Sequence, residues 1–553
     1  MIAQDGPAVL LSAASARALD QEASASWGLE PFALVEAAGR RCAQVLTAAL
    51  PCLFPAGVSG TPNRDAPRIV GFAGSGSNAA DAMVLLRSLL LSGYADAERS
   101  LLVINKVPAV GEHNPRSEAF RSLVKMEVPV LVWENAPWDS AVLSDCLKTA
   151  DLIIDGIAGT GLEGPLRGQA AEMARAINKL KKTGHTAQNL SLFIVSIDVP
   201  SGISDSWKPG MPIVEADAVL AIEPLKLCLF RPAARPYGGI ILPVGEIFPS
   251  RLIAQFCTAE LIAWDYARAL IPRVNKTAYK YERGVAEIRA GSPDTPGAAR
   301  IAARGAQAAG AGLVRLVVDQ AIHPILAVNA GGVMVAAIAA NGGDTAVAGG
   351  GDSRFNPDAI LLGPGWGKSP DREIMLRRAL EKEAAGIPLI LDADAILLAK
   401  DQVFHGNALL TPHPGELAAY AGVSKDEILA DPAPLLLRLA AEKNAHFLFK
   451  SHVMYAASPA GRLSIIDGMA PVLGMGGTGD LLAGFCTGIA ARCFAIAEQW
   501  RAAGWEFSLY SCALAAAALL IESAKSPALA SRFLDPLELA DRAANLAGEA
   551  WLT

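Results

Sequence analysis

The sequence predicts an α/β protein of two domains, each built on a mostly parallel sheet that helices cover on both faces. Three observations lead to this prediction. The chain has 553 residues, too many for one ordinary core. Hydrophobic residues make up 52% and charged residues 19%, a balance that suits sheets buried on both faces. Finally, one apolar strand after another ends in a polar or glycine-rich loop, as in doubly wound folds.

Composition also excludes some classes of partner. The net charge is −7 and no long basic run is present, so we expect no binding to nucleic acid. The first residues lack the basic flank and apolar run of a signal peptide, and the apolar stretch at 512–521 is too short to span a bilayer. The eight cysteines form no CxxC pair, which indicates core thiols in a reducing compartment. We therefore expect a cytoplasmic protein that does not bind membranes.

The first half of the chain has the pattern of a nucleotide-binding unit. Residues 12–50 carry two amphipathic helical patterns, and the second begins at Pro31. RIVGFA (68–73) predicts a short strand that leads into a glycine turn and a helix. ADAVLAI (216–222), PLKLCLF and GGIILPVGEI predict the last strands of this sheet. Residues 251–275 carry helical patterning, and we interpret them as the connection to a second domain.

Polar side chains gather where the predicted strands of the first half end. Asn78 and Asp81 follow the first strand, Asp155 ends a later one, and Asp198 with Ser201 ends a third. Because ligands bind beyond the carboxyl ends of strands in open parallel sheets, these side chains are expected to converge on one pocket. Each aspartate alone is equally well explained as a cap of a helix or turn. The three strand ends together favour a site.

The second half repeats the pattern of strands and polar loops. Residues 279–318 predict a strand, a Gly/Pro loop, a helix rich in alanine and glycine, and another strand. A buried strand at 358–367 ends in a glycine loop, and one at 388–398 ends in Asp392 and Asp394. Both aspartates have the position of caps, so we keep them off the list of catalytic residues.

Two further segments place charged residues near the same sheet edge. Residues 407–422 predict a strand, then His413 between two prolines, then a helix opened by Glu416. A histidine in this position can simply hold a turn, and a first-turn acid favours the helix dipole, so the residues alone leave both roles open. Residues 446–457 predict a strand that carries Lys450.

The stretch PVLGMGGTGDLLAG (471–484) has the clearest chemistry. Gly476, Gly477 and Gly479 crowd ahead of Asp480, and an apolar run that predicts a buried helix follows. Glycines let the backbone approach a ligand, and the free N–H groups at a helix start hold anions. A carboxylate beside such a site is suited to remove a proton from a hydroxyl while the amides hold a phosphoryl group. The competing interpretation is a turn whose aspartate caps the helix.

Two sets of motifs resemble a known family over nearly the whole chain. The second half is similar to the ribokinase-like, ADP-dependent NAD(P)H-hydrate dehydratases, in the motifs GPGWG (363–367), DADA (392–395), TPHPGE (411–416), the Lys450 segment and GMGGTGD (474–480). The first half resembles the Rossmann-like NAD(P)H-hydrate epimerases, in the motifs VEAAG (35–39), GSGSNAAD (74–81), DGIAGTGLEGPLR (155–167) and SIDVPSG (196–202). The resemblance to bifunctional NAD(P)H-hydrate repair enzymes implies an epimerase domain over 1–250, a connection over 251–275 and a dehydratase domain over 276–553.

This family repairs NADH or NADPH that has gained water across a double bond of the nicotinamide ring, a damage product with R and S epimers. The resemblance implies that the second domain uses ADP to phosphorylate the hydroxyl of the S epimer. Loss of phosphate then restores the dihydronicotinamide and releases AMP. Asp480 would be the base, and a magnesium ion is expected on the phosphates. ADP rather than ATP, and NADH versus NADPH hydrate, are not decided by the loops.

The resemblance also implies binding residues in the dehydratase domain. The residues implied for ADP or AMP are Lys450, Ser451, His452, Val453, Met454, Gly476, Gly477 and Gly479. Those implied for the hydrated cofactor are Ala298, Gly365, His413 and Asp480.

For the first domain, the resemblance implies interconversion of the R and S epimers, with Asp198 as the candidate for acid–base work. A potassium ion would be held by the oxygen atoms of Asn78, Asp155 and Ser201. The residues implied for the hydrated nucleotide are Ser77, Asn78, Ala79, Ala80, Asp81, Gly159, Thr160, Gly161, Leu162, Glu163, Gly164, Pro165 and Asp198. The family resemblance also implies self-association.

One motif departs from the family pattern. The family has two asparagines and then two glycines before the aspartate, whereas this chain has Ser77, Asn78, Ala79 and Ala80, with Ala82 in place of another glycine. An alanine forced to positive φ would cost about 1–2 kcal/mol, so we expect a loop of different shape here.

Two alternatives differ from the repair interpretation. The glycine-rich stretch before Asp480 also fits a ribokinase-like kinase for a small alcohol, although TPHPGE, GPGWG and the first domain argue against it. The first domain could instead be a nucleotide-binding or scaffolding module without chemistry, an alternative raised by the altered residues before Asp81.

Overall fold

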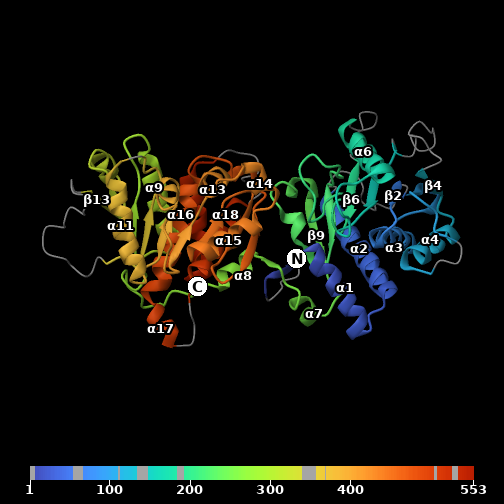
Figure 1. Ribbon diagram of the computed structural model, residues 1–553, viewed down its shortest axis with the longest axis horizontal. Coiled ribbons are helices and arrows are strands. Elements are labelled where there is room, and N and C mark those ends of the chain that lie inside the picture. The colour runs from blue at the N-terminus through green and yellow to red at the C-terminus, as the bar shows by residue number, and fades with distance from the viewer. Residues whose placement is uncertain are drawn as a thin grey trace. The chain divides into compact units, whose positions relative to one another are not determined.

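The computed structural model describes residues 6–53, 66–109, 113–133, 147, 149–183, 192–338, 356–367, 369–502, 507–525 and 534–552. The chain forms two compact units (Figure 1). Val9–Ala259 make up the first unit, and the residues from Glu260 onward make up the second.

A parallel sheet forms the centre of the first unit. Its described strands are β2 (Ile69–Ala73), β3 (Ser100–Ile104), β4 (Val130–Val132), β5 (Leu152–Gly156), β6 (Phe193–Ile197), β7 (Ala218–Ile222) and β9 (Ile240–Val244). They lie in the order β4-β3-β2-β5-β6-β7-β9, and every neighbouring pair is parallel. The order of strands reverses between β2 and β5, which makes this the switch point where ligands bind in open α/β sheets.

Helices cover both faces of this sheet. The described helices are α1 (Ala13–Trp27), α2 (Pro31–Leu53), α3 (Ser77–Leu91), α4 (Pro115–Lys125), α6 (Gly168–Thr183) and α7 (Ser250–Ala254). Alternate residues of one strand enter different cores: Ile69 and Ala73 pack with α2, α3 and α4, whereas Val70 and Phe72 pack with α6. The predicted αβα sandwich, with two helices before β2, the first strand of this sheet along the chain, is confirmed.

Two expectations for the end of this unit are wrong. In PLKLCLF only β8 (Leu225–Lys226) is a strand, and it pairs in parallel with β1 (Ala8–Leu11) instead of extending the sheet. Leu227–Phe230 then form a buried 3₁₀ turn, because a short apolar run can be buried without being a strand. The segment 251–275, expected to be helical, also contains the strand β10 (Ala259–Leu261).

The second unit has a larger, mostly parallel sheet. Its described strands are β10, β11 (Val285–Arg289), β12 (Leu313–Val318), β13 (Val333–Ala337), β14 (Ala359–Leu362), β15 (Leu389–Leu391), β16 (Ala408–Leu410), β17 (His446–Phe449), β18 (Val453–Ala457) and β19 (Leu463–Asp467). They lie in the order β13-β12-β11-β14-β15-β16-β17-β18-β19-β10. Only the pairs of β18 with β17 and with β19 are antiparallel. Residues 446–457 are therefore two strands, not the single strand we expected, and Lys450 lies in the turn between them.

Helices again lie on the sheet. The described helices are α8 (Trp264–Ala269), α9 (Pro296–Ala308), α10 (His323–Ala327), α11 (Asp371–Ala384), α12 (Asp394–Leu398), α13 (Pro414–Ala421), α14 (Lys425–Ala430), α15 (Ala433–Lys443), α16 (Thr478–Ala495), α17 (Ala497–Ala502), α18 (Leu509–Ala524) and α19 (Pro536–Trp551). The buried helix predicted after Asp480 is α16.

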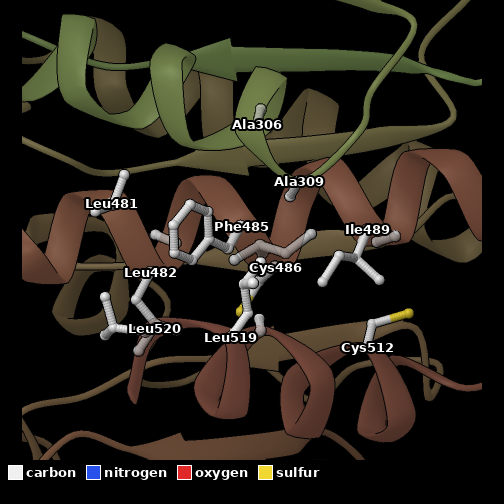
Figure 2. Packing of buried hydrophobic residues seen from close by; sticks show 14 of the residues in the cluster. Ala306, Ala309, Leu481, Leu482, Phe485, Cys486, Ile489, Cys512, Leu519 and Leu520 are labelled. Carbon is white, nitrogen blue, oxygen red and sulfur yellow. The ribbon is translucent and has the colours of Figure 1, made fainter. Parts of the chain in front are cut away.

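Small residues let α9 lie unusually close to α16. A Cβ atom added at Gly484 would lie 2.2 Å from the carbonyl oxygen of Ala302, and one at Gly488 would lie 2.4 Å from that of Ala306. Figure 2 shows α16 between α9 and α18, with Phe485 directed into the apolar contact. This packing fixes the axis of α16, and with it the position of its first turn.

No described helix combines the length and apolarity needed to cross a membrane, including α18, which contains the apolar stretch 512–521. The described cysteines are free thiols, and most of them are buried, as the scattered pattern predicts.

Candidate active sites

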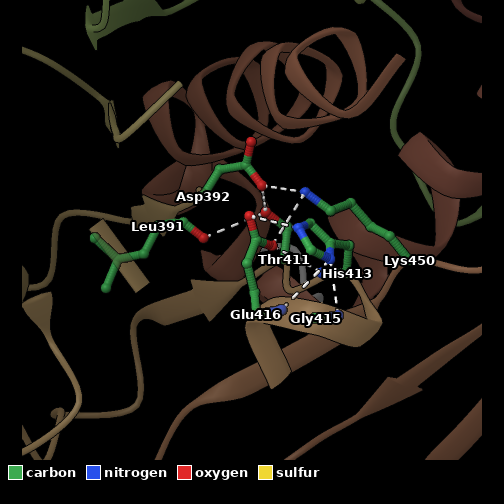
Figure 3. Close-up of polar contacts among 7 residues, drawn as sticks. All are labelled: Leu391, Asp392, Thr411, His413, Gly415, Glu416 and Lys450. Carbon is green, nitrogen blue, oxygen red and sulfur yellow. Dashed lines mark hydrogen bonds and ion pairs between the residues drawn. The ribbon is translucent and has the colours of Figure 1, made fainter. Parts of the chain in front are cut away.

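In the second unit, three neighbouring parallel strands deliver a charged cluster to one edge of the sheet. Asp392, Thr411 and Lys450 follow β15, β16 and β17 directly. Lys450 forms an ion pair with Asp392, which also accepts a hydrogen bond of 2.7 Å from the hydroxyl of Thr411 (Figure 3). The carboxylate of Glu416 lies 4.0 Å from the Lys450 ammonium. The lysine is thus held between two carboxylates that lie far apart in sequence.

His413 and Glu416 hold the start of α13. His413 is the N-cap residue, and its Nδ1 atom accepts hydrogen bonds from the backbone N–H groups of Gly415, at 2.9 Å, and of Glu416. Glu416 in return accepts a hydrogen bond of 2.8 Å from the backbone of His413. Since Nδ1 is an acceptor, the neutral ring carries its hydrogen on Nε2. The turn-holding role suggested by the sequence is confirmed for His413, and contact with the hydrated cofactor stays a prediction.

The glycine-rich turn brings the start of α16 against this cluster. Gly477 is the N-cap residue with φ of +94°, a conformation that L side chains rarely adopt. The hydroxyl of Thr478 donates hydrogen bonds to two carbonyl groups of the turn, those of Leu473 and Met475. A Cβ atom added at Gly479 would lie 3.4 Å from the Lys450 ammonium. The N–H groups of the first turn therefore lie beside a fixed positive charge, an arrangement that suits an anion.

Asp480 lies in the first turn of α16, and its carboxylate has no ion pair or hydrogen bond in the described part of the chain. Burial raises its pKa to about 6, with further upward contributions from Asp392 and Glu416 that Lys450 partly offsets. Burial also raises the pKa of Glu416. For Lys450, burial lowers the pKa, but Asp392 and Glu416 outweigh it and the net shift is upward. At neutral pH the lysine is therefore charged, and Asp480 is an ionised base close to its pKa.

The other residues implied for the dehydratase domain lie at two places. Gly365 has φ of +57°, and a Cβ atom added there would lie 2.7 Å from that of Ala298, so these two predicted residues are neighbours. Thr295, just before α9, donates a hydrogen bond of 2.7 Å to the carbonyl of Gly365. Of the residues implied for the nucleotide, Ser451 and His452 lie in the turn after Lys450, whereas Val453 and Met454 begin β18 with buried side chains.

In the first unit, Asp155 is completely buried and accepts four hydrogen bonds. One oxygen accepts from the hydroxyl of Ser201, at 2.5 Å, and from the backbone of Ile157. The other accepts from the hydroxyl of Ser196, at 2.7 Å, and from the backbone of Ser201. Burial raises the pKa of Asp155, and these hydrogen bonds oppose the shift. The structure therefore brings together Asp155 and Ser201, two of the three residues implied for the cation.

Asn78 lies in the first turn of α3, next to the loop after β5. A Cβ atom added at Gly159 would lie 3.3 Å from Cβ and Cγ of Asn78. The Asn78 side-chain nitrogen is buried and has no hydrogen-bond partner among the described residues. Amide, hydroxyl and carboxylate oxygens suit a hard cation such as potassium in donor type. Because four hydrogen-bond donors already engage the Asp155 carboxylate, a cation bound there would compete with them.

A second charged cluster in this unit contains Asp198, Lys226 and Asp81. The ammonium of Lys226 lies 2.6 Å from a carboxylate oxygen of Asp198, and both side chains are largely buried. Asp198 itself has φ of +64°. Burial raises the pKa of Asp198 although Lys226 lowers it. Burial, followed by the charge of Asp198, raises the pKa of Asp81 well above its usual range. The cluster thus contains one carboxylate paired with a cation and a second carboxyl group with a raised pKa.

The altered motif before Asp81 is helical rather than a loop. Residues 77–81 are the first residues of α3, and Ala79, Ala80 and Ala82 all have negative φ. None of the three alanines is therefore strained. The expectation of a loop of different shape is therefore wrong, because this segment is the start of a helix. The neighbouring Gly156 makes room for it, because a Cβ atom added there would lie 2.4 Å from that of Ala82.

A cavity of about 270 Å³ lies beyond the carboxyl ends of β2, β3 and β5, at the switch point of the first sheet. Gly74 follows β2, and Leu162, Glu163 and Pro165 come from the glycine-rich loop after β5. These three loop residues were among those implied for the hydrated nucleotide. Asp81, Asp155 and Asp198 are not among the described residues that line this cavity.

Two residues of these clusters were not predicted to be functional. Asp392 was interpreted as a cap, although it directly follows the buried strand β15. Lys226 was assigned to a strand only. A lysine inside the apolar run PLKLCLF was the available signal, because a buried lysine needs a carboxylate partner.

The fold and the two clusters define the class of protein: a Rossmann-like αβα unit followed by a ribokinase-like αβα unit, each with charged residues at the carboxyl ends of parallel strands. Two family models match the chain. The model described as NAD(P)H-hydrate dehydratase matches residues 286–532, and that described as YjeF-related protein N-terminus matches residues 31–228.

Curated proteins of similar length match most of the chain. The bifunctional NAD(P)H-hydrate repair enzyme Nnr of Moorella thermoacetica is 28% identical, with 87% of this chain and 88% of the relative covered. The enzyme of the same name from Gloeobacter violaceus is 29% identical, with 88% and 89% covered. Among solved structures, the ADP/ATP-dependent NAD(P)H-hydrate dehydratase of Bacillus subtilis is 23% identical, with a TM-score of 0.43. The match covers 52% of this chain and 97% of the Bacillus chain. The chain belongs to the family of bifunctional NAD(P)H-hydrate repair enzymes.

Proposed function

We propose that this chain repairs hydrated NADH and NADPH in two steps at two sites. An epimerase domain over residues 1–250 interconverts the R and S epimers. A dehydratase domain over residues 276–553, joined by the segment 251–275, removes water from the S epimer. The observation that carries the proposal is the position of Asp480. Its carboxylate, which has no ion pair or hydrogen bond among the described residues, lies at the start of α16. There Lys450 lies against Gly479, and Asp392 holds that lysine in place.

In the dehydratase domain, Asp480 removes the proton from the substrate hydroxyl as that oxygen attacks the terminal phosphoryl group of ADP. The bond between the bridging oxygen and the terminal phosphorus breaks, and AMP leaves. The N–H groups of Gly476, Gly477 and Gly479 and the ammonium of Lys450 stabilise the transferred phosphoryl group. The carbon–oxygen bond of this phosphate ester then breaks and phosphate leaves with the bonding electrons. The neighbouring ring carbon loses a proton to solvent, and the double bond of the dihydronicotinamide is restored.

Magnesium, when bound with the nucleotide, would neutralise the phosphate charge. The described residues contain no group of three carboxylate, histidine or cysteine side chains placed to hold a metal ion by themselves. This agrees with the usual behaviour of magnesium, which is held mainly by substrate phosphates, water and one or two carboxylates. The residues implied for ADP, Lys450 to Met454 together with the glycines before Asp480, follow from the family resemblance.

In the epimerase domain, Asp198 accepts a proton from the substrate and returns it to the substrate as the two epimers interconvert. The charge of Lys226 favours the ionised form of Asp198 and opposes the burial that raises its pKa, while burial raises the pKa of Asp81 and favours its protonated form. Potassium, when bound by Asn78, Asp155 and Ser201, would supply a positive charge for the phosphates of the nucleotide. Leu162, Glu163 and Pro165 of the loop Gly159–Pro165 line the cavity at the switch point, and this loop would bind the nucleotide there. Self-association and a cytoplasmic location, both expected from the sequence analysis, remain predictions.

The test uses the purified full-length chain with ADP, magnesium and a mixture of R and S NADH hydrate. Recovery of dihydronicotinamide absorbance is followed together with AMP and phosphate. We expect one AMP and one phosphate for each NADH formed, and recovery beyond the S fraction. A stable phosphorylated product without absorbance recovery would refute the proposal and support the small-molecule kinase. Recovery that stops at the S fraction would refute only the epimerase half.

A further inference from the structure

The second unit has two adjoining cavities away from the residues of the proposed reaction. They measure about 580 and 460 Å³, within the usual range for small-molecule sites. Both are lined by Pro272, Arg273 and Trp500. Because Trp500 belongs to α17, we call them together the α17 cavities (Figure 1).

A buried arginine that has no hydrogen-bond partner in the described part of the chain lines the first of these cavities. Arg492 lies in the last turn of α16 and is only 3% exposed. Its Nε and one of its terminal nitrogens are buried without a hydrogen-bond partner among the described residues. Its guanidinium carbon lies 4.5 Å from the ring centre of Trp551. A cation–π contact leaves the N–H donors unsatisfied, and such donors are rare in protein interiors unless a ligand completes them.

The surrounding charges favour an anion as that ligand. Arg273, Lys276 and Arg283 line the same cavity as Arg492, whereas Glu282 is the single acidic side chain among its described lining residues. The Nε of Arg283 is also buried without a hydrogen-bond partner among the described residues, whereas one of its terminal nitrogens donates a hydrogen bond of 3.3 Å to the carbonyl of Gly310. Burial lowers the pKa of Arg492, the neighbouring Cys493 and Cys512 oppose that shift, and the charge of Arg283 adds to it. Among the described residues, neither Arg283 nor Arg492 forms an ion pair with a carboxylate, and guanidinium groups left in this way suit phosphate.

Aromatic rings form part of the second cavity. Trp500 and Phe507 both line it, and their ring centres lie 5.6 Å apart in an edge-to-face arrangement. Such rings offer a surface on which a planar base can stack. We propose that the α17 cavities bind a nucleoside phosphate, with its phosphate on Arg283 and Arg492 and its base against Trp500 and Phe507.

This site is separate from the one that contains Asp480. Both Asp480 and Arg492 belong to α16, and twelve residues of helix at 1.5 Å each place them about 18 Å apart along the axis. The α17 cavities lie at the carboxyl end of that helix, and Asp480 lies at its amino end. The inference therefore does not depend on the proposed reaction.

The test is hydrogen–deuterium exchange on the full-length chain with AMP, adenosine or inorganic phosphate as separate probes, because exchange reports where each probe acts. We expect AMP to slow exchange in peptides that cover 272–283 and 492–500. Inorganic phosphate should do so at a concentration at least about tenfold higher, and adenosine should have no effect. Arg492→Met should raise the AMP concentration needed by at least about tenfold, since hydrogen bonds to charged groups are lost. Arg438→Met, which removes an exposed arginine paired with Glu442, is the matched control.

Thermal unfolding separates binding from a structural role. Because Arg492 has no hydrogen-bond partner among the described residues, Arg492→Met should keep the midpoint of the free protein and lose the stabilisation by AMP. If the midpoint of Arg492→Met falls, Lys276→Met is tested instead, because Lys276 is exposed and lines the same cavity. This variant should weaken AMP binding at this site without unfolding the protein. Three results would overturn the proposal: no protection of these peptides by any probe, protection that the variants leave unchanged, or protection by inorganic phosphate as strong as that by AMP.

Discussion

Both units place a lysine against a carboxylate at the carboxyl ends of parallel strands, but the lysine stands in a different relation to the proposed base. In the second unit Lys450 is paired with Asp392, and Asp480 stays free with a pKa of about 6. In the first unit Lys226 is paired directly with Asp198, the proposed base itself. The comparison shows two ways in which a buried carboxylate can serve as a base. Either a nearby ion pair adjusts its pKa, or a cation pairs with it directly.

The largest expected effect is that of Asp480→Asn on the second unit alone. Removing a general base lowers the rate by about 10²–10⁴-fold. We expect this loss in the formation of NADH from the S hydrate, measured by absorbance. The rate of R/S interconversion should stay unchanged. Asp401→Asn, at an exposed position of the same unit, should leave both rates unchanged. An equal loss of epimerisation in Asp480→Asn would contradict the separation of the two sites.

Lys226→Met tests the direct pairing in the first unit. It leaves Asp198 buried without its cation, a change that costs about 3–5 kcal/mol for a buried pair. The pKa of Asp198 is already raised and should rise further, so the native state binds more protons than the unfolded state. The free energy of unfolding should therefore fall as pH rises through that range. Denaturant melts at several pH values measure this, and Lys226→Met with Asp198→Asn should recover much of the loss. A loss that does not change with pH would exclude this explanation.

Gly484→Ala tests whether close packing of α16 on α9 positions the base of the second unit. The added methyl group would lie 2.2 Å from the carbonyl oxygen of Ala302, so the helices must separate. We expect a loss of about 1–3 kcal/mol in the free energy of unfolding, as for other overpacked sites. Gly476→Ala is the control, because an added Cβ there meets nothing within 4 Å. Equal stability of the two variants would show that the interface relaxes without cost.

The smallest effect is the dependence of the dehydratase on pH. Asp480 acts as a base only when ionised, so the turnover number should fall as pH drops through about 6 and stay level above neutrality. Lys450→Met removes a charge that lowers the pKa of Asp480, and the midpoint should therefore move to higher pH. A pH profile at saturating ADP and hydrate measures both. An unchanged midpoint in Lys450→Met would mean that another group controls the profile.

Local pattern predicted the elements that carry these sites. Apolar runs located the strands before Asp155, Asp198 and Asp392, and the glycines before Asp480 located the start of α16. The pairings could not be predicted in the same way. Asp392 and Lys450 are 58 residues apart in sequence, and Asp198 and Lys226 are 28 apart. Such contacts depend on which strands become neighbours, and periodicity within one segment does not contain that information.

The altered motif before Asp81 shows a different limit. Its alanines predicted either strain or a changed loop, because the sequence does not reveal backbone angles. In the structure these residues are helical, and Gly156 leaves the space that Ala82 fills. An alanine replacing a glycine therefore has to be judged together with the residue that faces it.

The most direct test of the central claim is a mixing experiment with Asp480→Asn and Asp198→Asn as two separate full-length proteins, supplied with ADP, magnesium and R/S NADH hydrate. Asp480→Asn alone should interconvert the epimers without forming NADH. Asp198→Asn alone should form NADH only up to the S fraction, followed by slow spontaneous epimerisation. The mixture should recover all of the NADH at a rate that rises with the amount of Asp480→Asn protein. A mixture that stops at the S fraction would contradict the claim that the two units perform successive steps.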